Sequence, residues 1–205
     1  MDGTWDQWAL DLWDYRRQVH EMYRQVRRDG PGAGTRDAWV HARDLLFAGH
    51  PQSPIEDGGE FDGLSYFPYD PDWRTMGTFV PTEGADATLG HSAEGSTRFL
   101  EIGEIEFDVS GHHATLEVLW LDVYGGGIFL PFRDATNGAN TYGGGRYLLD
   151  TVKGADLGHE GDQIVLDFNY SYHPSCVYSE RWSCPLAPAA NRLPFAVEAG
   201  ERLSP

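Results

Sequence analysis

Past Arg74, apolar and polar residues alternate one by one, and this pattern constrains the fold more than any other feature of the sequence. The clearest run covers residues 104–109, where three apolar residues alternate with three acidic ones. Gly111 then turns the chain into a second alternating run over residues 114–120. A period of two is typical of a strand with one buried face. The pattern therefore predicts an antiparallel hairpin.

Further strands are expected at about 127–133, 142–151 and 162–170. The connections between them are too short for helical crossovers, so the sheet should be antiparallel. We expect this sheet to curl into a β-barrel or a β-roll. The proline-rich stretch from Pro174 to Pro194 predicts an ordered but non-regular segment laid over the sheet.

The first fifty residues follow a helical period instead. Seven apolar residues between Trp5 and Val26 are spaced alternately three and four apart, which places them on one helical stripe. The sequence Asp-Gly-Pro-Gly at 29–32 should end this helix, and Thr35 can N-cap a second helix that ends at Gly49. The expected hairpin packs on its own domain, although the stripe could alternatively form a homodimeric coiled coil.

Together these patterns predict an α+β fold that is mainly β. A helical hairpin over residues 1–49 would cover an antiparallel barrel or roll over residues 50–205.

The amino-acid composition limits the classes of partner that this protein is expected to bind. The 205 residues carry 15 Lys and Arg against 32 Asp and Glu, a net charge of −17 that repels nucleic acids and anionic membranes. No apolar run approaches the roughly 18 residues of a membrane span, and the first residues lack the features of a signal peptide. We therefore expect a cytoplasmic protein with no nucleic-acid or membrane partner.

Residues 131–147 combine two arginines, two tyrosines and a glycine triplet around one expected turn. Glycines inside a strand usually mark a bulge or the close approach of a ligand or another backbone. Arg133 and Arg146 on adjoining strands could clamp the carboxylate or phosphate of a small anionic molecule. Alternatively, they pair with Asp134, Asp150 or Asp167 as buried structural bridges.

Five further side chains are candidates for the same pocket. Tyr142 and Tyr147 flank the glycine triplet, so Tyr142 could act in proton transfer and Tyr147 could bind substrate, although tyrosines often serve packing alone. Asp167 is a candidate general base beside Asn169 as a hydrogen-bond donor, unless it is solvent-exposed or paired structurally. His173 is a second candidate for proton transfer.

Cys176 and Cys184 are the only cysteines, and they follow His173 in a His-x2-Cys-x7-Cys pattern. Zinc could bind this set if a fourth ligand came close, but structural zinc sites usually show paired close spacings, so no cofactor is predicted. The cysteines could instead form a disulfide or remain two buried thiols, and Cys176 could be a nucleophile activated by His173.

Several separated motifs resemble a known family. They are HPQSP at 50–54, FDGLSYFPYDP at 61–71, PFRDAT at 131–136, TYGGGRYLLD at 141–150, LDFNYSYHPSCVY at 166–178 and CPLAPAANRL at 184–193. Together they are similar to the family of uncharacterised proteins called domain of unknown function 1684. The resemblance implies a shared fold and no established activity. Members usually have a glutamate where this chain has Ala190, and tend to have an asparagine at His173.

These observations lead to three functional hypotheses. The first is a soluble enzyme that acts on a small organic anion by hydrolysis, elimination or isomerisation. The second is a non-catalytic protein that binds such a ligand in the same pocket. The third is a structural or assembly protein that uses the N-terminal helical stripe.

Overall fold

The computed structural model describes residues 4–55 and 61–204, with side chains from residue 7 onward. Two helices come first, α1 (Thr4–Asp29) and α2 (Ala33–Gly49). They form the predicted hairpin, and α1 ends where expected, with Gly30 in the left-handed region at φ +78°. The predicted N-cap at Thr35 was wrong. The Arg36 amide donates to the carbonyl of Gly32, so Gly32 is the N-cap and Thr35 already lies within the first turn of the helix.

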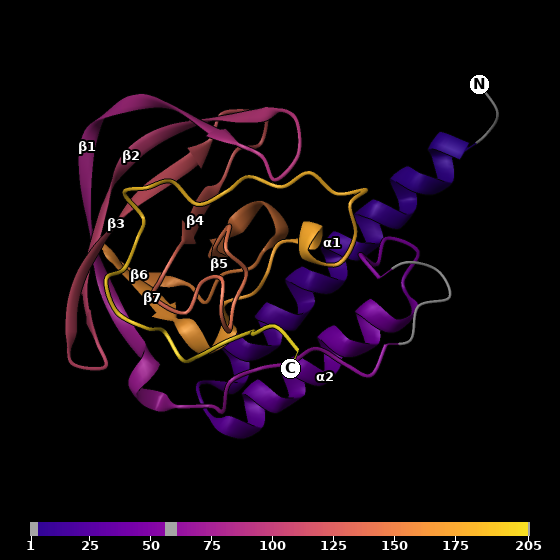
Figure 1. The fold of residues 1–205 in the computed structure, drawn as a ribbon, viewed down its shortest axis with the longest axis horizontal. Coiled ribbons are helices and arrows are strands. Elements are labelled where there is room, and N and C mark those ends of the chain that lie inside the picture. Colours follow the sequence, from indigo (N-terminus) through magenta and orange to yellow (C-terminus); the bar gives the residue numbers. More distant parts are fainter. Residues whose placement is uncertain (1–3, 56–60, 205) are drawn as a thin grey trace.

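Seven antiparallel strands follow. They are β1 (Arg74–Gly90), β2 (Ser96–Val109), β3 (His112–Leu121), β4 (Ile128–Phe132), β5 (Arg146–Asp150), β6 (His159–Glu160) and β7 (Gln163–Asp167). Their order in the sheet is β5-β4-β3-β2-β1-β7-β6. The sheet curls strongly, with the long strands β1 to β3 on the side away from the helices (Figure 1). The mainly-β α+β fold class is thus as predicted.

The sheet is open rather than a closed barrel. In the described part of the chain, its edge strands β5 and β6 do not pair with each other. The outer edge of β5 is occupied by an irregular segment instead, because the backbones of Tyr147 and Tyr172 exchange two hydrogen bonds of 2.9 and 3.1 Å. This bridge satisfies polar groups that a closed barrel would satisfy by strand pairing.

The predicted hairpin is the junction between β2 and β3. Val109 pairs with His112, and the two residues between them, Ser110 and Gly111, both have positive φ, as a tight two-residue turn requires. The alternating apolar residues from Ile105 to Val109 and from Ala114 to Val118 are buried. The predicted alternation fails at Trp120, which is exposed while Leu119 is buried, where the register shifts between Glu101 and Gly103. His112 and His113 at the turn are exposed.

Three apolar clusters hold the described residues together, and the smallest, around Phe99, Leu119 and Phe129, lies under the β5 edge at Tyr147. The largest fills the inside of the curled sheet, and its most buried members include Ile105, Val118, Leu130, Phe132, Leu166 and Phe168. Residues from the irregular C-terminal segment, including Val197 and Ala199, complete this cluster. The second cluster joins the helices to the sheet. It includes Val19, Tyr23 and Val26 of α1, Trp39 and Leu46 of α2, and Ala155 and Tyr170 of the main body.

The segment from Pro174 to Pro194 is irregular, as its prolines predicted. Its only helical part in the structure is the short 3-10 turn η4 (Ser175–Val177). No helix in the described residues has the length and apolar character needed to cross a membrane.

Candidate functional site

Arg146 lies in the protein core, at the first residue of β5. Its side chain is completely buried. One terminal nitrogen, Nη2, donates to Asp134 Oδ2 at 2.9 Å and to the carbonyl of Val197 at 2.8 Å. The other, Nη1, donates to the carbonyls of Ala199 and Glu201. Four protein acceptors therefore use both terminal nitrogens, which is the arrangement of a buried structural bridge.

The Arg133 side chain does not form a common binding site with that of Arg146. Phe132, which precedes Arg133, pairs with Arg146 across β4 and β5, and successive side chains on a strand point to opposite faces. The Arg133 backbone is held in place by hydrogen bonds of 2.8 Å with the carbonyl of Asn191 and the amide of Leu193. The structure therefore does not bring the two guanidinium groups together, and the geometry of Arg146 favours the structural alternative.

The glycine triplet allows close packing rather than ligand binding. A Cβ at Gly145 would lie 2.5 Å from the backbone oxygen of Phe132, and its φ of +101° suits glycine. A Cβ at Gly144 would lie 2.3 Å from the ring of Tyr142 and 2.7 Å from Leu186. The close approach expected from the sequence is thus made by the chain's own backbone and side chains.

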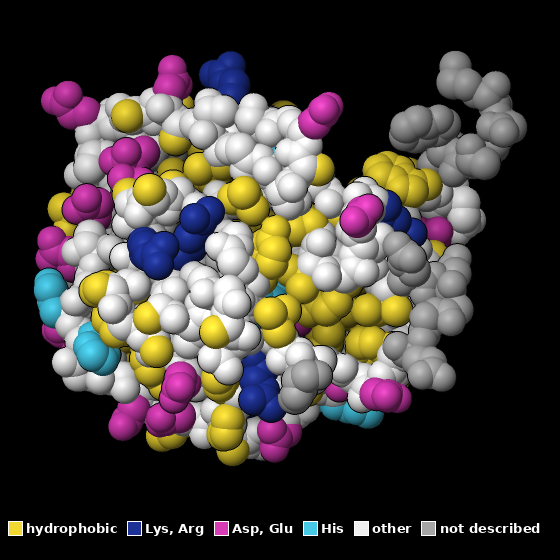
Figure 2. Space-filling model, viewed as in Figure 1, with side chains coloured by type: hydrophobic (Ala, Val, Ile, Leu, Met, Phe, Trp, Pro, Cys, Tyr) yellow, Lys and Arg dark blue, Asp and Glu magenta, His cyan; other side chains and the backbone are white. Residues whose placement is uncertain are grey.

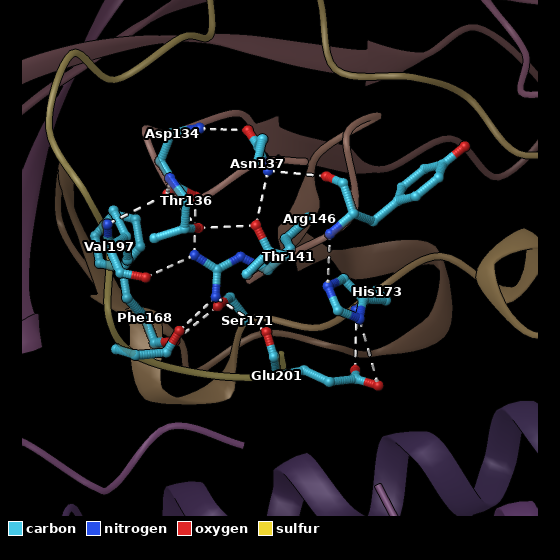
Figure 3. A network of polar contacts seen from close by, with 12 residues as sticks. Asp134, Thr136, Asn137, Thr141, Arg146, Phe168, Ser171, His173, Val197 and Glu201 are labelled. Carbon is cyan, nitrogen blue, oxygen red and sulfur yellow. Dashed lines mark hydrogen bonds and ion pairs between the residues drawn. The ribbon is translucent and has the colours of Figure 1, made fainter. Parts of the chain in front are cut away.

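A polar chain runs from the backbone of Tyr142 through His173 to Glu201, and Figure 3 labels its last two members. The backbone amide of Tyr142 donates to His173 Nε2 at 3.2 Å. Since Nε2 accepts, a neutral His173 ring must carry its proton on Nδ1, which lies 3.9 Å from Glu201 Oε1. Burial lowers the pKa of His173 to about 4, so the ring is neutral at neutral pH. His173 therefore has no free acceptor nitrogen for proton transfer.

Glu201 is the centre of a second set of contacts, and its side chain is fully buried. Its Oε2 receives hydrogen bonds of 2.9 Å from Arg43 Nη1 and from the backbone amide of His173. The hydroxyl of Tyr178 donates to its other oxygen. Because Arg43 belongs to α2, this buried ion pair fastens the helices to the main body.

Asp167 and Asn169 lie together but away from the other candidates. Asp167 Oδ1 accepts from the backbone and the side-chain amide of Asn169, at 3.1 and 2.9 Å. The Asn169 side chain also exchanges two hydrogen bonds with the backbone of Asp70. Burial raises the pKa of Asp167, while its hydrogen bonds to Asn169 oppose the shift. These contacts cap the 3-10 turn η3 (Phe168–Tyr170), a structural role.

A set of adjoining hollows lies between α1 and the β5 edge of the sheet. Three cavities of about 50, 260 and 270 Å³ meet there, and we call them together the helix–sheet cleft. Lys153 lines all three cavities. Tyr15 and Tyr172 line the first two, and Arg16 and Tyr147 line the last two. The cleft thus combines aromatic walls with three cationic side chains, Arg16, Lys153 and the buried Arg43, and with the carboxylate of Asp150.

Lys153, the only lysine of the chain, belongs to the 3-10 turn η2 (Thr151–Lys153) directly after β5. Its Nζ lies 2.7 Å from Asp150 Oδ2, and its side chain remains 40% exposed. Partial burial alone would lower the pKa of Lys153, but the ion pair with Asp150 outweighs burial and raises it. Lys153 is therefore a permanent cation that faces the cleft.

The tyrosines of the cleft keep their protons at neutral pH. Burial raises the pKa of Tyr15, and raises those of Tyr147 and Tyr172 further. The Tyr147 hydroxyl donates to the carbonyl of Pro185 at 2.6 Å. They can accordingly provide apolar ring surface and hydrogen bonds, whereas a phenolate base is not expected there.

Sequence reasoning found some of these residues and missed others. The backbone amide of Tyr142 contacts His173, although the Tyr142 side chain lines none of the three cavities, and Tyr147 lines the cleft. Arg16, Lys153 and Glu201 were missed. The single lysine in an arginine-rich chain was a visible signal for Lys153, whereas nothing in the sequence distinguishes Glu201 from the other acidic residues.

The fold and the cleft define a class of mainly-β protein in which a pair of helices covers one side of a curled sheet. An aromatic hollow with cationic side chains lies between the helices and the sheet. The chain belongs to the family described as "Protein of unknown function (DUF1684)", whose model matches residues 59–202. Relatives in this family were expected from the sequence motifs, and the match confirms that expectation.

A solved structure of similar fold comes from Haloarcula marismortui. This uncharacterized protein, determined by solution NMR, is 38% identical, with a TM-score of 0.57. The match covers 82% of this chain and 91% of that chain. None of the curated proteins matches the chain.

The two departures from the family pattern lie in different environments. Ala190 is exposed, so a glutamate at this position would lie at the surface. The next residue, Asn191, is buried and donates to the carbonyls of Glu117 and Pro131. His173 is buried in the polar chain already described. The exposed Ala190 position is accordingly not part of the helix–sheet cleft.

Proposed function

We propose that the chain binds a small organic anion in the helix–sheet cleft. The observation that carries this proposal is the convergence of Arg16 and Lys153 on one aromatic hollow in a protein of net charge −17. Ligand pockets typically combine apolar and aromatic walls with a few placed polar groups. Figure 2 shows acidic side chains around the rim of the face in view. With 32 Asp and Glu against 15 Lys and Arg, a hollow lined by several cations is unusual for this chain.

Arg16 supports an anionic ligand more directly than Lys153 does. In the ranges that the structure describes, Arg16 makes no ion pair with a carboxylate, while its neighbour Arg17 pairs with Asp14 at 2.6 Å. The Lys153 ammonium shares its charge with Asp150, and it has donors left for a second acceptor. A carboxylate or phosphate between the two cations would receive charge-assisted hydrogen bonds.

Binding, rather than turnover, is the function that this geometry favours. Of the groups that the sequence suggested for proton transfer, only His173 lines any part of the cleft, and its Nε2 already accepts from the backbone. Asp167 and Asn169 cap a turn outside it. Within the described residues, the one carboxylate that lines the cleft is Asp150, and it is paired with Lys153 at 2.7 Å. The cleft therefore offers positive charge and aromatic surface without an unpaired carboxylate to act as general base.

The test is a thermal-shift screen of the full chain against aliphatic and aromatic carboxylates and organic phosphates, because a ligand that binds only the native state raises Tm. We expect an anion that stabilises the wild type to bind Arg16→Met about tenfold or more weakly, the loss of one charge-assisted hydrogen bond. Arg17→Met is the matched control, since Arg17 lines none of the three cavities and should leave the affinity unchanged. Equal losses in both variants, or no stabilising anion at all, would contradict the proposal.

A further inference from the structure

The charged side chains that line the helix–sheet cleft leave one positive charge uncompensated. Arg43 is paired with Glu201 at 2.9 Å. Lys153 is paired with Asp150, the one lining carboxylate among the described residues, at 2.7 Å. Arg16 forms no ion pair in the part of the chain that the structure describes. A ligand with one negative charge would therefore balance the cleft, whereas a second negative charge would be repelled by Asp150.

The 270 Å³ cavity of the cleft has an apolar floor. Phe99 and Phe129, which belong to the smallest apolar cluster, line it and are stacked with ring centroids 5.3 Å apart. The ring of Tyr147 meets Phe129 edge-on at 4.6 Å. Leu121 and Val152 complete the apolar wall. This surface can bury the hydrocarbon part of a ligand.

The uncharged polar groups of this cavity already have partners within the protein. Thr97 Oγ1 lies 2.7 Å from His91 Nε2, and the Tyr147 hydroxyl donates to the carbonyl of Pro185 at 2.6 Å. A ligand with several hydroxyl groups would give up hydrogen bonds with water there that the protein replaces only in part. The cavity therefore favours an apolar body over a hydroxylated one.

The neighbouring 260 Å³ cavity is lined differently. Gln52, Ser183 and the thiol of Cys184 reach it, and Cys184 forms no disulfide with Cys176. These side chains can form hydrogen bonds, so we assign the apolar part of the ligand to the 270 Å³ cavity.

Positive charge and apolar floor are adjacent. Lys153 and Arg16 line both of the larger cavities, and Lys153 Nζ lies 6.0 Å from the ring centroid of Tyr147. An anionic group held by the two cations would thus lie beside the floor, and an apolar group of the same molecule could cover it. The volume of about 270 Å³ is below the range of roughly 300–1,000 Å³ that is typical for drug-sized ligands, so the molecule is small.

We infer that the ligand of the helix–sheet cleft is a monocarboxylate with a compact apolar body. Its carboxylate lies between Arg16 and Lys153, and its body covers Phe129 and Leu121. This inference rests on the proposed anion site and narrows its ligand from organic anions in general to one class. Dicarboxylates, dianionic phosphate esters and hydroxylated acids should bind more weakly.

The first test compares four carboxylates by calorimetric titration of the full chain. Hexanoate has the expected character, gluconate adds hydroxyl groups to six carbons, adipate adds a second carboxylate, and acetate lacks the apolar body. We expect hexanoate to bind at least tenfold more tightly than each of the others, because each fully buried methylene group strengthens binding about fourfold. Its binding should also show a more negative heat-capacity change than that of acetate.

A pair of variants tests the apolar wall. Val152 lines the 270 Å³ cavity, whereas Val123 lines no part of the cleft, and both are partly exposed, at 38% and 58%. Val152→Asn should weaken hexanoate about threefold or more and leave acetate unchanged. Val123→Asn should change neither affinity.

The position of the ligand can be measured in the wild type, even if a variant fails to fold. We expect nuclear Overhauser effects between the hexanoate methyl group and the side chains of Leu121 and Phe129. Contacts with Trp182 of the other cavity instead, or equal affinities for hexanoate, gluconate and adipate, would overturn the inference. The anion site would still stand in those cases if Arg16→Met weakened all of these ligands. If none of the four carboxylates binds, both the inference and the proposed function are wrong.

Discussion

At the scale of single residues, burial decides what His173 can do. The side chain is 2% exposed, and its pKa is lowered from 6.5 to about 4 because burial penalises the charged ring. Its ring nitrogens face a backbone amide and a carboxylate that already holds Arg43. His173 is thus a neutral structural element of the core at neutral pH.

The lowered pKa of His173 predicts a loss of stability in acid. Between about pH 6.5 and pH 4, the unfolded chain binds a proton at this ring that the native protein does not bind. The contribution to stability is therefore complete above about pH 6.5, and its loss is complete below about pH 4. This loss amounts to about 3 kcal/mol. Urea unfolding at several pH values should show that His173→Asn loses less stability on acidification than the wild type by about this amount.

His113→Asn is the matched control for that measurement. His113 is exposed beside Asp108, so its replacement should leave the dependence of stability on pH almost unchanged. If the wild type and His173→Asn lose stability in parallel between pH 7 and pH 4, then His173 is not held neutral by the fold.

Residue types alone could not place the candidate site. The sequence raised two interpretations of Arg146, a ligand clamp and a bridge to an aspartate such as Asp134. The choice depended on the carbonyls of Val197 and Ala199, which come from a segment about fifty residues away that has no regular periodicity. Tertiary contacts of this kind leave no local pattern in a sequence.

At the scale of elements, the glycine triplet determines the path of the turn that precedes β5. The three glycines precede the strand, and the backbone of Phe132 and the side chains of Tyr142 and Leu186 fill the space that the Cβ atoms of Gly144 and Gly145 would occupy. β5 is thereby drawn close to β4 at the site where Arg146 enters the core.

Gly145 and Gly143 should respond differently to the same substitution. At Gly145, alanine would require φ of +101° and would place its Cβ 2.5 Å from the Phe132 oxygen, so we expect a loss of about 2 kcal/mol or more in the free energy of unfolding. At Gly143, an alanine Cβ would have no neighbour within 4 Å among the residues that the structure describes, so the loss should stay within about 0.5 kcal/mol. Urea denaturation of the two variants measures both effects, and equal losses would refute this account of the turn.

Elements were predicted where one periodicity governs a segment, although β2 begins at Ser96, ahead of the predicted run, and no bounds were predicted for β1. The helical stripe gave α1 and the alternation gave the β2–β3 hairpin, since each pattern reports one buried face. The closed barrel was not found, because closure depends on which edges meet in space. In this fold the outer edge of β5 pairs with the backbone of Tyr172, which lies outside any strand.

At the scale of the whole molecule, acidic charge opposes compactness. The net charge is −17, and acidic side chains line the rim of the face in Figure 2, whereas the ion pairs of Arg146 and Arg43 are buried. Repulsion between surface charges destabilises a compact state, and dissolved salt screens it. Buried pairs are screened much less.

Salt should therefore stabilise this protein. We expect the urea midpoint to rise between about 0.05 and 1 M NaCl and to rise equally in KCl, because screening does not distinguish the two cations. Sucrose at matched osmolality controls for general exclusion from the protein surface. A midpoint that falls with salt would show that surface ion pairs, rather than repulsion, dominate the electrostatics.

The packing of α1 and α2 on late parts of the chain has a consequence for synthesis. Ribosomes release both helices roughly a hundred residues before Ala155 and Tyr170, which complete their apolar cluster. At about 5–20 residues per second, the stripes of Val19, Tyr23 and Trp39 have no final partner for several seconds. The first part of the molecule to be made is thus among the last to be buried, and during that interval it is the segment of the nascent chain most in need of a chaperone.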